Sequence, residues 1–222
     1  MNNALQSSTL QFLRTLERNN NREWFNENKN LYLTAQEDVI GFVEGLIESI
    51  GSWDEQVAKL DAKKSLFRIY RDTRFSKDPR PYKTNFGASL GIGKGSERAG
   101  YYLHIEPGKS FLAGGIYQPN ADLLKKLRSE IVYDAEKFLE LIEEDTFRQN
   151  FRGLSVENKL KRVPTGFDKE HPMAEYLKLK HFIVSHPIAD DVITSKNATQ
   201  YITKVYESMA PLVNYLNTAL DY

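Results

Sequence analysis

Basic side chains crowd into one short stretch of this chain, residues 63–83. The basic members are Lys63, Lys64, Arg68, Arg71, Arg74, Lys77, Arg80 and Lys83. The whole chain has 30 basic and 30 acidic residues, but this stretch has eight basic residues against two acidic ones, so it carries +6 and the remainder −6. So dense a positive charge needs a counter-charge, supplied either by the protein's own carboxylates or by a bound group.

Arginine is the residue best suited to two-pronged recognition of a phosphate or a carboxylate. Arg68, Arg71 and Arg74 recur every three residues, with Asp72 among them. On a strand, Arg68 and Arg74 share a face with Asp72, whereas on a helix the three arginines gather on one face. Either geometry brings two or more guanidinium groups together. We expect an anion site in which Asp72 orients one arginine or carries a proton.

Tyr82, Lys83 and Asn85 directly follow a Pro-x-Pro sequence at residues 79–81. Proline fixes its own backbone angles and restricts the preceding residue, so these side chains are held rigidly, as a binding site requires. We expect them to complete the anion site. Two alternatives stay open: the arginines pair only with carboxylates of the fold, or the interleaved aromatic residues stack on nucleic-acid bases.

His104 and Glu106 lie two residues apart on an expected strand and therefore share a face with Tyr102. A neutral histidine beside a carboxylate can act as a general base, which makes His104 the second catalytic candidate besides Asp72. The alternative is a strand histidine with a purely structural hydrogen bond. No histidine spacing in the chain is typical of a metal site, and no cofactor is indicated.

The glycine-rich stretch at residues 87–96, GASLGIGKGS, does not have the spacing of a phosphate-binding P-loop. Five residues, instead of four, separate its first glycine from Gly93-Lys94, and Gly95 follows the lysine. We interpret it as a flexible turn that closes over the basic stretch.

Helices are expected at both ends of the chain. The first, capped within residues 7–9, carries Leu10, Leu13 and Leu16 on one stripe and ends at the three asparagines 19–21. A single long helix follows over 22–50 and ends at Gly51. Later helices are expected from Pro119, over 135–147, and over 198–220 with a kink or restart at Pro211.

Strands are expected in the middle of the chain. Alternating patterns predict them at 65–75, 86–92, 101–106 and 110–118, the last two joined by a hairpin at Pro107-Gly108-Lys109, and another at 181–186. Short turns between successive strands imply an antiparallel meander. The fold class is therefore α+β, a single domain over 1–222, with about four to five strands flanked by N-terminal and C-terminal helices.

Composition narrows the class of protein. The chain of 222 residues has no cysteine, which excludes disulfides and cysteine nucleophiles. It shows neither a signal peptide nor an apolar run long enough to span a membrane, so we expect a cytoplasmic protein without membrane partners. Zero net charge argues against nucleic acid as the partner, but is compatible with one focused anion pocket. The sequence gives no indication of oligomeric state.

Two blocks, Arg68–Phe75 (RIYRDTRF) and Pro81–Phe86 (PYKTNF), resemble the signature of a bacterial family known as domain of unknown function 2461. Residues 19–25, 100–105 and 114–119 resemble other blocks of that family. One departure is the sequence Asp78-Pro79-Arg80-Pro81-Tyr82, where the family usually has Asp-Lys-x-Pro-Tyr. The resemblance implies no activity.

The function expected from these residues is a basic anion-binding site of an enzyme that acts on a small phosphorylated or carboxylated molecule. The alternative is a non-catalytic module that binds an acidic protein or nucleic acid, and purely structural arginines are a third reading. We also expect the turn at Asn19–Glu23 to border the basic site.

Overall fold

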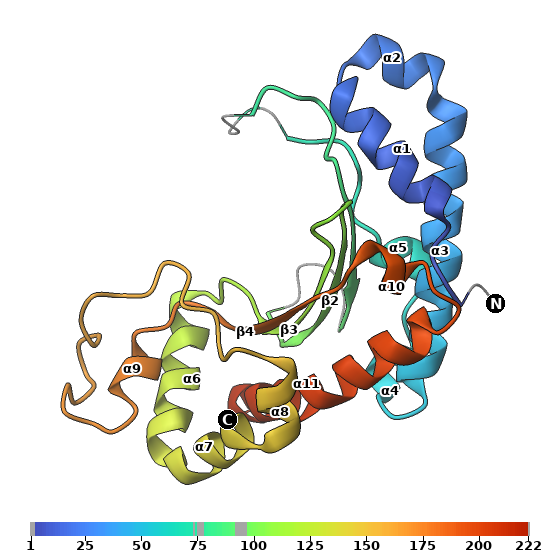
Figure 1. Ribbon diagram of the computed structural model, residues 1–222. Coiled ribbons are helices and arrows are strands. Elements are labelled where there is room, and N and C mark those ends of the chain that lie inside the picture. The colour runs from blue at the N-terminus through green and yellow to red at the C-terminus, as the bar shows by residue number, and fades with distance from the viewer. Residues whose placement is uncertain (1–2, 73, 75–77, 92–96, 222) are drawn as a thin grey trace. The chain divides into compact units, whose positions relative to one another are not determined.

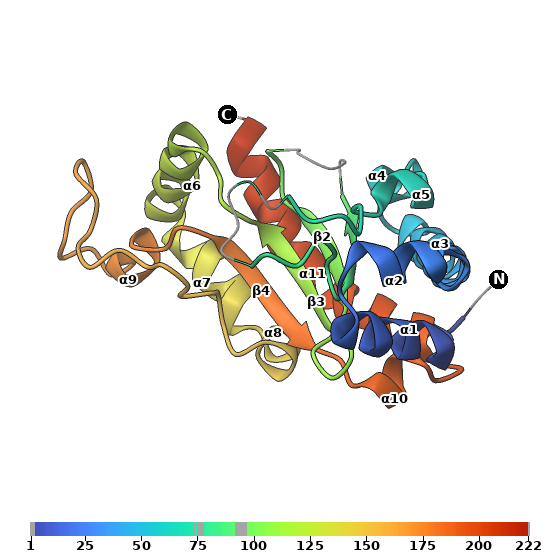
Figure 2. The same cartoon turned by 90° about the horizontal axis from the view of Figure 1, so that it is seen from above.

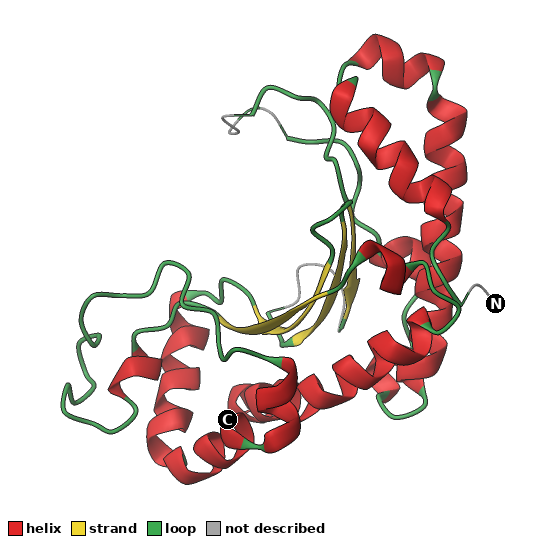
Figure 3. Ribbon diagram, viewed as in Figure 1, coloured by secondary structure: helices red, strands yellow, loops and turns green. Residues whose placement is uncertain are grey.

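The computed structural model describes residues 3–72, 74, 78–91 and 97–221 (Figure 1). It has a four-stranded antiparallel sheet in the order β1-β2-β3-β4, drawn in yellow in Figure 3. In the chain, helices precede β1, lie between β3 and β4, and follow β4. The strands are β1 (Phe86–Leu90), β2 (Gly100–Ile105), β3 (Phe111–Ile116) and β4 (Phe182–Pro187). The predicted α+β class with an antiparallel meander is therefore confirmed.

The chain forms two compact units, each built from separate segments of sequence. The first comprises Met1–Lys94, Tyr102–Leu112 and Pro187–Lys204, and the second Gly95–Tyr101, Ala113–His186 and Val205–Tyr222. The single-domain boundaries 1–222 stay a prediction.

The first unit begins with a layer of helices. They are α1 (Ser7–Arg18), α2 (Arg22–Glu27), α3 (Lys29–Gly51), α4 (Glu55–Ala58) and α5 (Ala62–Ser65). Helix α1 lies along α3, as both views show (Figures 1 and 2), and buries the predicted leucine stripe. The expected cap within residues 7–9 is wrong, because Thr9 lies inside α1 and donates to Asp38 Oδ2 at 2.6 Å.

The single helix expected over 22–50 is instead the pair α2 and α3, interrupted at Asn28. Asn28 has backbone angles outside the helical range, and its side-chain Nδ2 donates to the carbonyl of Trp24. Asparagine side chains compete with the helical backbone for hydrogen bonds, which explains the break. The end at Gly51 is confirmed.

The expected strand over 65–75 is wrong for the residues that the structure describes. Only isolated antiparallel bridges occur there, Leu66 with Ala88 and Tyr70 with Tyr82. Three residues lie between Leu66 and Tyr70, but five lie between their partners Tyr82 and Ala88. The pairing register therefore shifts between the two bridges, and a continuous ladder cannot form. Thr73 and Phe75 lie outside the described residues, as do 92–96 of the expected glycine-rich turn.

The hairpin between β2 and β3 is confirmed. Lys109 N donates to Glu106 O at 2.9 Å, and Gly108 has a φ of +73°, which favours glycine. In the second unit, β3 and β4 approach closely at Gly115. Its φ is +120°, and a Cβ there would collide with the carbonyl oxygen of Phe182.

Four helices of the second unit come from the later part of the chain, and α6 packs against α7 and α9 (Figure 2). They are α6 (Ala121–Tyr133), α7 (Ala135–Glu143), α8 (Asp145–Asn150) and α9 (Ala174–Leu177). Helix α6 starts after its cap Asn120, so Pro119 lies outside it, contrary to expectation. The helix expected over 135–147 is two helices because the Glu144 side chain caps α8.

Two further helices complete the chain, α10 (Asp190–Ile193) and α11 (Ala198–Asp221). Helix α11 continues through Pro211 without a restart.

Candidate functional site

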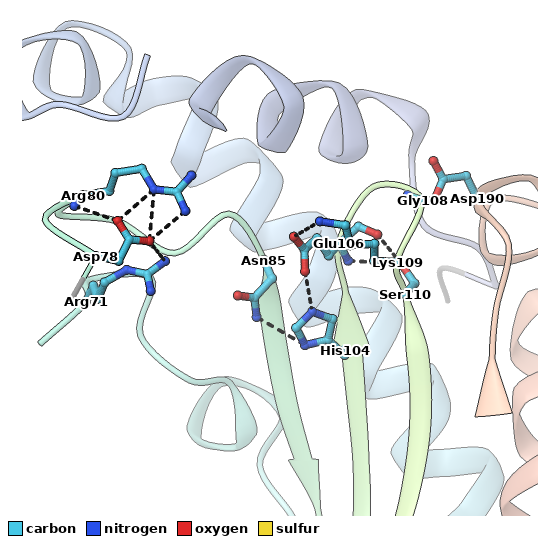
Figure 4. A network of polar contacts seen from close by, with 10 residues as sticks. All are labelled: Arg71, Asp78, Arg80, Asn85, His104, Glu106, Gly108, Lys109, Ser110 and Asp190. Atoms are coloured by element: carbon cyan, nitrogen blue, oxygen red, sulfur yellow. Dashed lines mark hydrogen bonds and ion pairs between the residues drawn. The ribbon is translucent and has the colours of Figure 1, made fainter. Parts of the chain in front are cut away.

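Arg71, a predicted anion-binding residue, and Arg80, another arginine of the basic stretch, meet a single carboxylate in the first unit. Asp78 accepts hydrogen bonds from Arg80 Nε at 2.9 Å and Arg80 Nη2 at 2.7 Å, and its Oδ2 lies 3.4 Å from Arg71 Nη2 (Figure 4). Hydrogen bonds from Arg80 and the charge of Arg71 hold the pKa of Asp78 far below its usual range. Arg71 and Arg80 thus receive their counter-charge from the protein itself.

Arg74 is also paired within the chain. Its Nε and Nη2 donate to Asp72 at 3.0 and 2.7 Å, a two-pronged ion pair. The pair lies at the surface, since the side chain of Arg74 is 77% exposed. The Arg74 hydrogen bonds lower the pKa of Asp72, with the charge of Arg68 contributing. As predicted, Asp72 orients one arginine.

Tyr82 is held by packing and by its backbone. The residue is 4% exposed, and its ring stacks on that of Phe25 with centroids 3.9 Å apart. The amide of Asn20 donates to Tyr82 O at 2.9 Å and accepts from Tyr82 N at 3.1 Å. The turn expected to border the basic site therefore contacts Tyr82, one of the predicted site residues.

Three of the predicted anion-binding residues line one pocket of about 240 Å³: Arg68, Lys83 and Asn85. Its other lining residues are Phe67, Gly87 and Tyr102. Lys83 Nζ lies 5.8 Å from the centroid of the Phe67 ring, within the range of a cation–π contact. The pocket carries two positive charges and an amide in its wall, and no carboxylate of the described residues lines it.

Arg68 differs from the other arginines of the stretch. Within the described parts of the chain it forms neither a hydrogen bond nor an ion pair, and the charge of Asp72 is its one electrostatic neighbour. Asp72, Arg71 and Arg74 do not line the pocket. The predicted cluster is thus divided between paired arginines and one arginine that faces a pocket.

His104 lies at the centre of a hydrogen-bonded chain of side chains beside this pocket. Its Nε2 is 3.0 Å from Glu106 Oε2, and its Nδ1 is 3.5 Å from Asn85 Nδ2 (Figure 4). The same Nδ1 is 3.1 Å from the Tyr102 hydroxyl. An ionised carboxylate only accepts, so Nε2 carries the proton and Nδ1 of the neutral ring accepts from Tyr102. The predicted shared face of Tyr102, His104 and Glu106 is present.

Tyr102 connects the pocket to His104. Burial, together with the charge of Glu106, raises the pKa of Tyr102 to about 12, so its hydroxyl is protonated at neutral pH. A Cβ at Gly87 would lie 2.5 Å from this hydroxyl, which explains a glycine inside a strand. The sequence pattern paired Tyr102 with His104, but only the fold places Phe67 and Gly87 in the same pocket wall.

Among residues 3–72, 74, 78–91 and 97–221, no three His, Asp or Glu side chains are grouped as metal ligands. No described helix is both long and apolar enough to cross a bilayer.

The fold and this site define an α+β protein with a basic pocket beside a histidine–glutamate pair. The chain belongs to the family described as Conserved hypothetical protein (DUF2461), whose model matches residues 8–215. The resemblance expected from the sequence blocks is thereby confirmed. No curated protein and no solved structure matches the chain significantly.

Proposed function

We propose that the pocket lined by Arg68, Lys83, Asn85 and Tyr102 binds a small phosphorylated or carboxylated molecule. The observation that carries the proposal is the position of Arg68, a guanidinium in the wall of a pocket without any internal hydrogen-bonded partner in the described chain. A guanidinium with unused donors is suited to an oxyanion.

The size of the pocket limits the ligand. Pockets for drug-sized molecules have volumes of roughly 300–1,000 Å³, whereas this one has about 240 Å³. A compact metabolite therefore fits better than an extended chain. The ring of Phe67 gives it an apolar surface beside the charges.

Tyr102, His104 and Glu106 give the pocket a route for a proton. A bound group that hydrogen-bonds to the Tyr102 hydroxyl can transfer a proton through it to His104 Nδ1, while Glu106 holds the ring by its Nε2–H and stabilises the imidazolium that results. The proposed proton transfer involves His104 and not Asp72, which is engaged by Arg74.

Arg71 and Arg80 take a structural role in this proposal. Their shared contact with Asp78 joins two parts of the loop that follows Tyr70. In this proposal, Arg71 and Arg80 are structural arginines, whereas Arg68 binds the ligand.

The test is a thermal-shift titration with small phosphorylated and carboxylated compounds. A ligand at 100 times its dissociation constant stabilises the folded state by about 2.7 kcal/mol. Arg68→Gln should weaken the binding at least about tenfold, the effect of losing a charge-assisted hydrogen bond. Arg74→Gln is the matched control, because it removes the same charge from the same loop outside the pocket.

Two outcomes would contradict the proposal. One is an equal loss of affinity in Arg68→Gln and Arg74→Gln, which would indicate a general charge effect. The other is binding of a single-stranded oligonucleotide in preference to small anions, with affinity falling steeply with salt, which would favour the nucleic-acid alternative.

A further inference from the structure

A second pocket, of about 340 Å³, lies in the second unit and shares no lining residue with the first. Its polar lining residues are Gln118, Arg128, Asn158, Lys180 and His181. Within the described part of the chain no acidic residue lines it, so the ionised side chains in its wall are cationic.

Arg128 is a buried cation without a carboxylate. Arg128 is 7% exposed, and its Nη2 donates to the backbone carbonyl of Leu179 at 2.9 Å. Its Nε is buried and has no hydrogen-bond partner in the described chain, nor does any described Asp or Glu form an ion pair with it. Burial lowers the pKa of Arg128, which reflects the cost of a charge removed from water. A buried charge without a counter-ion is unfavourable, so an anionic ligand would stabilise it.

His181 lines the same pocket and has a second buried donor. It is 3% exposed, and its Nδ1 accepts from the backbone N of Gln118 at 3.1 Å. An accepting Nδ1 requires the hydrogen of the neutral ring to be on Nε2. That Nε2 is buried and lacks a hydrogen-bond partner among the residues described. The ring itself is fixed, because Tyr117 stacks on it with centroids 4.8 Å apart.

The backbone of the pocket is strained at two points. Gln118 and Asn158 have φ values of +50° and +53°, and they are the two non-glycine residues with positive φ in the described chain. Such conformations are unfavourable for residues with a side chain, and they cluster at functional sites. The backbone N–H of Gln118, one of these two residues, donates to His181 Nδ1 and so sets the tautomer of that ring.

We propose that this pocket binds an organic anion, with the carboxylate or phosphate of the ligand accepting hydrogen bonds from Arg128 Nε and His181 Nε2. Lys180 is exposed at the pocket and adds a further positive charge. Leu124 and Leu160 line the same space and pack against the apolar part of the ligand. Two buried donors that the protein leaves unused are thereby satisfied by one ligand.

The experiment follows the imidazole nitrogens of His181 by NMR in the full chain. The probes are inorganic phosphate, phenyl phosphate, benzoate and hexanoate, and His181→Phe assigns the signals. Binding should shift the Nε2 resonance. Phenyl phosphate and benzoate, which combine an anion with an apolar ring, should bind more tightly than inorganic phosphate.

Arg128→Met should weaken this binding at least about tenfold, and Lys180→Gln several-fold, as losses of charged partners do. If Arg128→Met does not fold, Arg128→Lys replaces it, because lysine keeps the charge but has no Nε–H. Arg68→Gln, in the first pocket, should leave the shift of His181 unchanged, so failure of one proposal is distinguishable from failure of the other. The proposal is overturned if no probe shifts the His181 signals up to about 10 mM, well above a millimolar dissociation constant. Unchanged affinity in the Arg128 variant would overturn it equally.

Discussion

The hydroxyl of Tyr102 lies 3.1 Å from Nδ1 of His104, and Glu106 is on the other side of the imidazole ring. One residue of the pocket wall is therefore connected, through a histidine, to a carboxylate. The pKa of the Tyr102 hydroxyl should therefore respond to changes at Glu106.

Glu106→Gln should lower the pKa of Tyr102 from about 12 without returning it to its ordinary value, because burial raises it as well. A ¹³C-tyrosine NMR titration, with Tyr102→Phe to assign the signal, checks this. An unfolded tyrosine loses its proton at about pH 10, so in wild type the folded state should lose stability between that pH and about 12. A Tyr102 signal that titrates identically in both proteins would contradict the proposed connection.

Gly87→Ala should destabilise the fold by about 1–3 kcal/mol, the usual cost of overpacking, because its Cβ would lie 2.5 Å from the Tyr102 hydroxyl. Urea unfolding gives the free energies. In the double variant Gly87→Ala/Tyr102→Phe the colliding oxygen is gone, so part of the loss should be recovered. Strictly additive effects would mean that the two side chains do not meet.

Asn20→Ala should destabilise the fold by about 1–3 kcal/mol, because it leaves the N–H of the buried Tyr82 without its acceptor. Asn30→Ala is the control, since Asn30 is exposed on α3 and makes no side-chain hydrogen bond in the described chain. Chemical denaturation of both variants checks the difference. Equal stability of the two would show that Asn20 does not hold the loop at Tyr82.

Asp78→Asn should destabilise the fold near neutral pH, because Arg71 and Arg80 lose the charge that they share. The pKa of Asp78 is lowered in the folded state, so its contribution is present above its ordinary, unfolded value and is lost as the pH falls toward the lowered one. The melting temperatures of wild type and variant should therefore converge in acid. A gap that stays constant down to strongly acidic pH would exclude the ion pair as the cause.

Much of the fold was predictable from local patterns. The leucine stripe of α1 and the alternation of β2 and β3 produced correct elements, since each depends on neighbours a few residues away. The strand predicted over 65–75 does not form in the described residues, because an alternating pattern is equally compatible with a loop. The register shift depends on the spacing in the segment opposite, residues 82–88, which the pattern of 65–75 does not contain. Asn28 and Glu144 interrupt helices by side-chain capping, which periodicity does not reveal.

For the candidate site, the sequence predicted that the arginines need counter-charges, but not which of them the fold supplies. Asp72 and Asp78 are each close in sequence to an arginine that they bind. Arg68 has a different environment only because residues 83–87 and Tyr102 come beside it in the folded chain. The buried donors of Arg128 and His181 could not be predicted, since burial and an unused donor are properties of the tertiary structure.

The close approach of Gly115 to Phe182 has a consequence for how the chain folds. Strands β1, β2 and β3 succeed one another with short connections, but β4 pairs with β3 only after residues 117–181 have intervened. Closing that long loop is entropically costly, so this pairing should be a late kinetic event. Until residue 187 has left the ribosome, the nascent chain presents β3 as an open edge, which is a template for aggregation.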